Sequence, residues 1–162
     1  MRLALPLVTA VVLTVISAVS FARGAEVSAG GIVVTSAWAR STPPGAKVAA
    51  AYLTIENRGL QEDRLQGAKT DAAGSVAGHE TAEENGIARM RPVPDLRVAA
   101  GATLEMRPGG VHLMLMELRA PIRQGDQFSV TLDFANAGKL TVPLAVAPIG
   151  AAGPDAHSDH AM

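Results

Sequence analysis

Histidine and methionine side chains recur along this 162-residue chain at positions that suit a soft metal ion. Ten residues separate His79 from Met90, twenty-one separate Met90 from His112, and one separates His112 from Met114. Imidazole and thioether donors, with no thiolate and no required carboxylate, favour Cu(I) over zinc, magnesium or calcium. Because neutral thioethers need no deprotonation, binding at such a site should depend less on pH than binding at a thiolate site.

The segment Val111–Met116 has the sequence VHLMLM, which alternates two kinds of side chain. In a β-strand, His112, Met114 and Met116 share one face, and the two leucines between them share the other. The leucines already account for a core-facing side. The methionines can equally be ordinary packing residues, since methionine fills gaps in cores. The second face therefore indicates either burial on both sides or a ligand surface.

A hairpin is predicted between His79 and Met90. Asn85-Gly86 lies between two β-like runs, and this dipeptide is a specific signal for a two-residue hairpin turn. On paired strands, His79 and Met90 can lie near one another at the open end of the hairpin. The alternative is that His79 is a solvated loop residue and Met90 a core residue.

The composition excludes several classes of site. The chain has no cysteine, which excludes disulfide scaffolds, thiolate zinc sites, iron–sulfur clusters, cysteine nucleophiles, a blue-copper centre and a cysteine-linked lipid anchor. The run His79–Glu83 begins like a zinc-protease motif but has glutamate where the second histidine is required. There is no Gly-x-Ser-x-Gly motif and no phosphate-binding glycine loop. We therefore expect no enzymatic activity.

The net charge of −1 shows no excess of basic residues of the kind that a nucleic-acid binder uses to contact phosphates.

Residues 1–22 have the pattern of a secretory signal peptide: Arg2, a long apolar run, and small residues around a cleavage site after Ala22. A second candidate site follows Gly24. The run is nearly long enough to span a bilayer, so an uncleaved anchor is the alternative. We expect cleavage and a mature protein in a bacterial periplasm, without a membrane anchor.

The rest of the chain is predicted to be one all-β domain, a sandwich or barrel. A chain of this length suits a single domain with its own core. Short apolar or alternating runs are separated by turns rich in Gly, Pro, Asn and Asp, which is typical of such folds. The runs are Ile32–Trp38, Val48–Ile55, Arg64–Gly67, Ser75–His79, Ile87–Pro92, Thr103–Met106, Val111–Leu118, Phe128–Phe134 and Leu140–Val146.

The domain is expected to cover residues 23–147, followed by a flexible tail at 148–162 that lacks periodicity. The tail contains His157, His160 and Met162, enough donors for a weak second metal site. Its imidazoles, with two nearby aspartates, would suit Cu(II) better than Cu(I). An inert polar tail is the equal alternative.

Taken together, the four spacings and their flanks resemble the PCu(A)C family of periplasmic copper chaperones. The resemblance extends from about Ile32 to about Val146, which is nearly the whole mature domain. It rests on Ala37–Arg40, Thr42–Gly45, Ala50–Ile55, His79–Thr81, Met90–Pro94 and Pro108–Met116.

The resemblance implies a cupredoxin-like Greek-key β-sandwich and one Cu(I) site near the surface. Its ligands would be His79, Met90, His112 and Met114. Met116 shares a strand face with His112 and Met114, so we expect it to lie beside the site, with direct binding of the metal as the alternative. The chain would be a carrier that catalyses no reaction. The implied acceptor is the dinuclear copper centre of cytochrome c oxidase subunit II, often with a Sco-type protein involved.

Two other functions stay open at this level. The first is a periplasmic copper-buffering or tolerance protein with the same ligands. The second is a metal-free secreted structural β-sandwich, in which His and Met are surface and packing residues.

One departure from the family is Gly78, where many members carry a bulkier residue. Its small size is expected to loosen the approach to the site.

Overall fold

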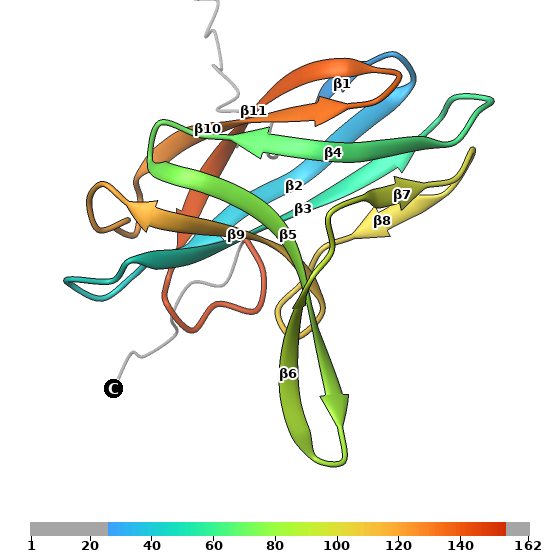
Figure 1. The fold of residues 1–162 in the computed structure, drawn as a ribbon. Helices are drawn as coiled ribbons and strands as arrows, with labels where there is room; N and C mark the ends of the chain where they lie inside the picture. The colour runs from blue at the N-terminus through green and yellow to red at the C-terminus, as the bar shows by residue number, and fades with distance from the viewer. Residues whose placement is uncertain (1–25, 155–162) are drawn as a thin grey trace, which may run out of the picture.

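The computed structural model describes residues 26–154, and all regular structure in that range is β-strand (Figure 1). The predicted signal peptide and the tail residues His157, His160 and Met162 lie outside the described residues. Within residues 26–154 no helix is long and apolar enough to cross a membrane. The strands are β1 Val27–Ala29, β2 Ile32–Arg40, β3 Val48–Asn57, β4 Asp63–Lys69, β5 Ala73–Glu84, β6 Ile87–Pro92, β7 Leu96–Val98, β8 Thr103–Glu105, β9 Val111–Leu118, β10 Gln127–Phe134 and β11 Gly138–Ala147.

The strands form two layers that join at both edges. Their order is β1-β2-β11-β10-β4-β5-β9-β3-β8, and an additional pairing joins β2 and β3, the strands next to the two ends of this path. Most pairings are antiparallel, and β11 runs parallel to β2. Between β4 and β5 only Ala68 and Val76 are paired, so the layers separate there (Figure 1). The prediction of an all-β sandwich is confirmed.

The core follows the alternation read from the sequence. In β10, Val130, Leu132 and Phe134 are buried, and the residues between them are partly or fully exposed. Burying a side chain of this kind stabilises the fold by about 1.5–3 kcal/mol. On β9, Leu113 and Leu115 are buried in the same core, as predicted.

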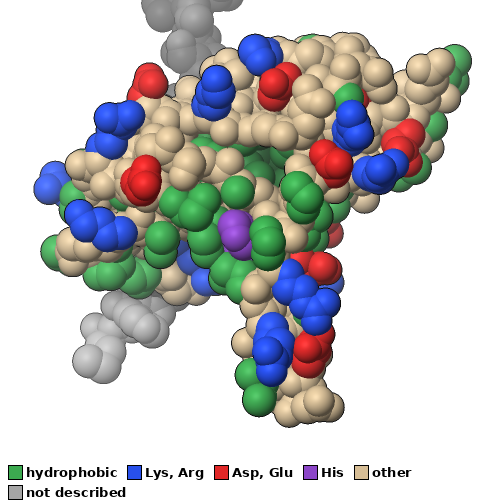
Figure 2. All heavy atoms as spheres, in the orientation of Figure 1, with side chains coloured by type: hydrophobic (Ala, Val, Ile, Leu, Met, Phe, Trp, Pro, Cys, Tyr) green, Lys and Arg blue, Asp and Glu red, His purple; other side chains and the backbone are tan. Residues whose placement is uncertain are grey.

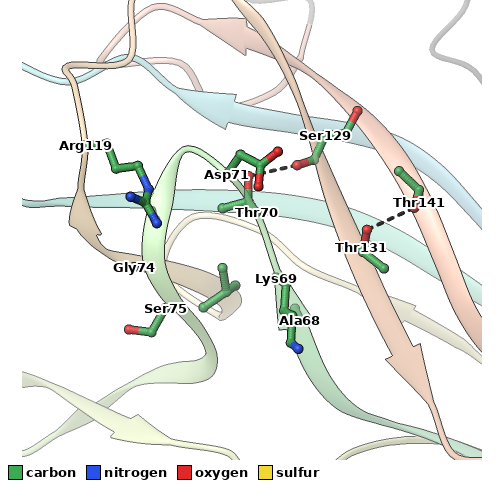
Figure 3. Close-up of a pocket in the computed structure, with 12 residues that line it drawn as sticks. Ala68, Lys69, Thr70, Asp71, Gly74, Ser75, Arg119, Ser129, Thr131 and Thr141 are labelled. Carbon is green, nitrogen blue, oxygen red and sulfur yellow. Dashed lines mark hydrogen bonds between the residues drawn. The ribbon is translucent and has the colours of Figure 1, made fainter.

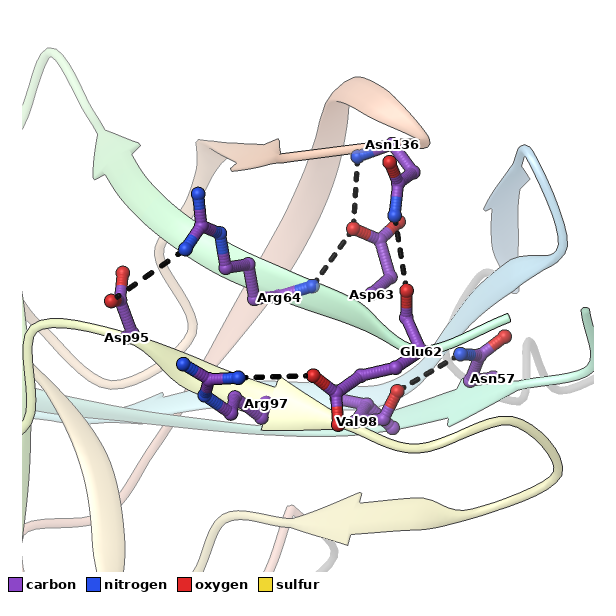
Figure 4. Close-up of polar contacts among 8 residues, drawn as sticks. All are labelled: Asn57, Glu62, Asp63, Arg64, Asp95, Arg97, Val98 and Asn136. Carbon is purple, nitrogen blue, oxygen red and sulfur yellow. Dashed lines mark hydrogen bonds and ion pairs between the residues drawn. The ribbon is translucent and has the colours of Figure 1, made fainter.

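Buried polar groups fix the loops at one end of the sandwich (Figure 4). Asp63, which starts β4, accepts three backbone hydrogen bonds, among them those from Asn136 (2.9 Å) and Ala137 (2.8 Å) in the β10–β11 turn. Asn57, which ends β3, donates to the Val98 carbonyl at 2.9 Å. Because these groups are buried, losing a partner costs more than the hydrogen bond itself contributes.

The chain stays in contact with the domain beyond β11. Ala151 is buried, and its carbonyl accepts hydrogen bonds from Nε (2.8 Å) and Nη2 (2.6 Å) of Arg40. This contact lies past residue 147, where we expected the domain to end. It holds the Arg40 side chain at the end of β2.

Candidate metal centre

The hairpin predicted from Asn85-Gly86 is present and projects from the body of the sandwich (Figure 1). Both turn residues have positive φ, 53° at Asn85 and 76° at Gly86, as a two-residue type I′ turn requires. The first part of β5 pairs with β9, and the outer part pairs only with β6. The base of the hairpin is therefore tied to β9.

Strand register brings the four candidate ligands to this base. His79 on β5 is directly opposite His112 on β9, and their rings stack with centroids 6.1 Å apart and planes 24° apart. Met114 is two residues from His112 on the same face of β9. Met90 on β6 is opposite Thr81, so it lies diagonally from His79 on the same face of the hairpin.

A shallow depression of about 340 Å³ collects most of these side chains. Figure 2 shows a histidine surrounded by hydrophobic side chains where the hairpin meets the body. Met90, His112 and Met114 all line the depression. His79 is not among its lining residues, and its ring lies beside that of His112. The other lining residues are Arg40, Ser41, Thr42, Pro43, Val48, Ala49, Ala50, Tyr52 and Ile149.

Both imidazoles are oriented by a backbone carbonyl. Nδ1 of His112 lies 3.0 Å from the Gly110 carbonyl oxygen, and Nδ1 of His79 lies 3.4 Å from that of Ala77. A neutral imidazole that carries its proton on Nδ1 presents the lone pair of Nε2. Histidine ligands of metal ions commonly donate their second N–H to a carbonyl in this way.

The four side chains differ widely in exposure. His112 is only 5% exposed, whereas Met90 is 50% exposed. His79 and Met114 are half-buried. A methionine this exposed contributes little to the core, so packing does not explain the residue type at position 90. The site is anchored in the domain at one end and open to solvent at the other.

A cluster of tilted aromatic rings supports the buried end of the site. The Tyr52 ring lies 4.5 Å from Trp38 and 6.3 Å from His112, measured between centroids. The Arg40 guanidinium lies over the Tyr52 ring, 5.8 Å from its centroid. Burial raises the pKa of the Tyr52 phenol above its usual value, and the Arg40 charge offsets part of this effect. The phenol is therefore neutral at physiological pH.

Gly78 makes the base of the hairpin tight, contrary to our prediction that it loosens the approach. Its carbonyl accepts a hydrogen bond from the Val93 N–H at 2.8 Å. A Cβ at this position would lie 2.7 Å from the Val93 carbonyl oxygen and 3.1 Å from Cδ1 of Leu96. Only glycine lets the chain after β6 pack this closely on β5, next to His79.

Met116 shares the face of His112 and Met114 but lies opposite Val48 and Ser75, and it does not line the depression. The described residues contain no group of three or more His, Cys, Asp or Glu that would hold a metal ion. A carboxylate-rich site is therefore absent from residues 26–154. The direct ligation of a metal by the four residues stays a prediction.

A larger pocket of about 530 Å³ lies away from this centre, at the β4–β5 opening (Figure 3). It is lined by Lys69, Arg119 and several hydroxyl side chains, and none of its described lining residues is a histidine or a methionine. Its charged side chains are exposed and point in different directions. Within residues 26–154, Met106 is buried in the core and Met116 lies outside the depression, whereas both histidines, Met90 and Met114 lie near the base of the hairpin.

Sequence reasoning missed two residues of this centre, Arg40 and Tyr52. Both lie within segments that carried the family resemblance, Ala37–Arg40 and Ala50–Ile55. The spacing of residues along the chain does not predict that they lie beside His112. Their positions depend on pairings between strands that are distant in sequence, β2 with β11 and β3 with β9.

Solved structures with a similar fold identify the structural class of this domain. The copper-bound PCuAC domain from PmoF2 has a TM-score of 0.67 and 26% sequence identity, covering 76% of this chain and 98% of that domain. The solution structure of CuI-DR1885 from Deinococcus radiodurans has a TM-score of 0.56 and 34% identity, covering 68% of this chain and 74% of that one. The fold is a cupredoxin-like β-sandwich of the PCuAC type.

Sequence comparison gives the family. Residues 32–146 match the model described as "LpqE-like: Putative lipoprotein LpqE-like". "Putative lipoprotein Lxx21020" of Leifsonia xyli subsp. xyli (strain CTCB07) is 39% identical over 119 residues, 73% of this chain and 69% of that protein. "Uncharacterized protein RP573" of Rickettsia prowazekii (strain Madrid E) is 25% identical over 60% of this chain and 55% of its own length. The chain belongs to the LpqE-like family.

Proposed function

We propose that this protein is an extracytoplasmic, periplasmic Cu(I)-binding chaperone that binds one copper ion and passes it to another protein. The observation that carries the proposal is the convergence of two imidazoles and two thioethers, from His79, Met90, His112 and Met114, at the base of one hairpin. The similar structures named for copper, CuI-DR1885 and the PmoF2 domain, support it. The lipoprotein names of the relatives fit a location outside the cytoplasm.

The donor set fits Cu(I) as cargo. Thioether sulfur and neutral imidazole are soft or borderline donors that suit this ion, and no carboxylate of residues 26–154 lines the depression. His79 and His112 would bind through Nε2, since Nδ1 of each faces a carbonyl. Met90 and Met114 would supply the two sulfurs. The buried His112 would retain the ion, and the exposed Met90 would give an acceptor access to it.

The acceptor we propose is the dinuclear copper centre of cytochrome c oxidase subunit II, with a Sco-type protein as the other candidate partner. The family resemblance supports this choice. A carrier needs only to bind and release the ion, so we propose no catalytic residue. Cu(II) binding by the tail residues His157, His160 and Met162 remains a separate proposal.

An anaerobic Cu(I) titration against a competing chelator tests the site. We expect the mature protein to bind one equivalent and a His112→Ala, Met114→Ala double variant to lose it. Binding that the double variant retains would exclude the four-residue site. In a deletion strain, loss of oxidase activity at low copper would support delivery, whereas copper sensitivity alone would support the buffering function.

A further inference from the structure

Arg40 introduces a positive charge into an otherwise neutral depression. Among the described residues that line it, Arg40 alone is charged; the others are apolar or neutral polar side chains, with Met90, His112 and Met114 among them. The candidate ligands themselves carry no charge in their metal-binding forms. The electrostatic potential in the depression therefore depends on this one guanidinium more than on any other lining group.

The guanidinium is fixed in place. Two of its N–H groups donate to the Ala151 carbonyl, at 2.8 and 2.6 Å, and it lies over the Tyr52 ring. The Tyr52 ring centroid is 5.8 Å from the guanidinium carbon and 6.3 Å from the His112 ring centroid. These contacts place the charge within about 12 Å of the His112 ring, a range over which partly buried charges interact measurably.

Carboxylates on the hairpin do not cancel this charge. Glu80 and Glu84 lie on the face of β5 opposite to His79, and Glu84 forms ion pairs with Arg89 and Arg91. Glu83 shares the face of His79 but lies four residues further out, roughly 13 Å along the strand. It is exposed, so water and salt screen it strongly.

We infer that Arg40 sets the oxidation-state preference of the centre, favouring Cu(I) over Cu(II). This inference rests on the proposed function, since it concerns the same site. A fixed cation repels Cu(II), with its additional unit of charge, more strongly than it repels Cu(I). If the ion lies as far from the guanidinium as the upper bound for the His112 ring, about 12 Å, then at an effective dielectric constant near 20 the additional repulsion corresponds to roughly a tenfold change in relative affinity. The imidazole and thioether ligands favour copper over other metals, and the charge of Arg40 favours Cu(I) over Cu(II).

The test measures Cu(I) and Cu(II) affinities separately, by competition with chelators specific for each ion. All proteins carry His157→Ala and His160→Ala, so that Cu(II) binding in the tail does not contribute. Arg40→Gln removes the charge and keeps a polar side chain. Arg40→Met is a second uncharged variant that still packs on Tyr52. Arg40→Lys keeps the charge and changes the hydrogen bonding.

Arg58→Gln is the matched control. It removes an equal charge from an exposed position just beyond β3, eight residues and roughly 26 Å along the chain from Ala50, a lining residue. We expect the ratio of Cu(II) to Cu(I) affinity to rise about tenfold in Arg40→Gln and Arg40→Met, equivalent to a potential about 60 mV lower. Arg40→Lys and Arg58→Gln should stay near the parent ratio.

The outcomes separate the inference from the proposed function. If the parent binds Cu(I) and either folded uncharged variant keeps the parent ratio, the inference is wrong and the chaperone proposal is unaffected. A change in Arg40→Lys equal to that in Arg40→Gln would also overturn it, because hydrogen bonding and not charge would then be responsible. If the parent binds no Cu(I), both proposals fail together.

Discussion

Replacing Gly78 with alanine tests how the hairpin is held against the domain. Gly78 precedes His79 on β5, and its missing side chain leaves room for the chain that follows β6. A Cβ here would meet the Val93 carbonyl oxygen at 2.7 Å, a distance that Cβ atoms do not tolerate. The obstacle is backbone, so it cannot rotate away as a flexible side chain would. The segment after β6 must therefore move outward.

The cost can be worked from these contacts. Overpacking by one methyl group destabilises a fold by about 1–3 kcal/mol. Moving Val93 outward also weakens its 2.8 Å hydrogen bond to the Gly78 carbonyl, which contributes about 0.5–1.5 kcal/mol. We expect a loss of about 2 kcal/mol and a Tm lower by roughly 6–10 °C for a domain of this size. Because Met90 lies on β6, which leads directly into the displaced segment at Val93, Cu(I) affinity should fall about tenfold or more, equivalent to about 1.4 kcal/mol.

Gly67→Ala is the matched control for this variant. Gly67 also lies within a strand, β4, and a Cβ there would meet only Cβ of Asp133, at 3.9 Å. That is an ordinary contact, so stability and copper affinity should be unchanged or slightly higher. Thermal unfolding and the chelator titration measure both quantities in the two variants. A Gly78→Ala protein with the parent Tm and the parent Cu(I) affinity would refute the tight-base interpretation.

Three further predictions concern other parts of the domain. Asp63→Ala should lower the free energy of unfolding by about 2–4 kcal/mol in urea titrations, since three backbone N–H groups lose their acceptor, while Cu(I) affinity stays unchanged. Met90→Leu should reduce Cu(I) affinity at least about tenfold with little change in Tm, because Met90 is 50% exposed; an equal loss in Met116→Leu would contradict the assigned ligand set. The raised pKa of Tyr52 stabilises the fold fully below the unfolded pKa of about 10 and less as pH rises through the folded value, so Tyr52→Phe should flatten the loss of stability in alkaline unfolding curves.

Local rules explain why the sequence located the candidate ligands. The two-residue period of a strand puts His112 and Met114 on one face whatever the rest of the fold does. The Asn85-Gly86 turn fixes the register of its hairpin, and that register puts Met90 near His79. Both placements depend on a few neighbouring residues, and the structure contains both the hairpin and the strand. The binding of a metal by these residues stays a prediction.

Long-range pairings explain what the sequence did not reveal. The stack of His79 on His112 depends on the β5–β9 register, which no turn between neighbouring strands fixes. Arg40 reaches its position through hydrogen bonds to Ala151, 111 residues away. The size of Gly78 alone predicts a loose approach to the site. Its effect depends on the backbone opposite it, and that backbone, at Val93, is known only in the folded chain.

The uneven burial of the centre follows from where its two strands lie. β9 is paired on both sides, with β3 and β5, and its alternate leucines are in the core, so His112 has little freedom to move. β6 is paired only with β5, and all its residues are exposed, so Met90 can change rotamer at little cost. An acceptor approaching the hairpin would therefore meet a replaceable thioether before the anchored imidazole. On the proposed function, this order lets copper be exchanged by substitution of one ligand at a time, without release of free ion.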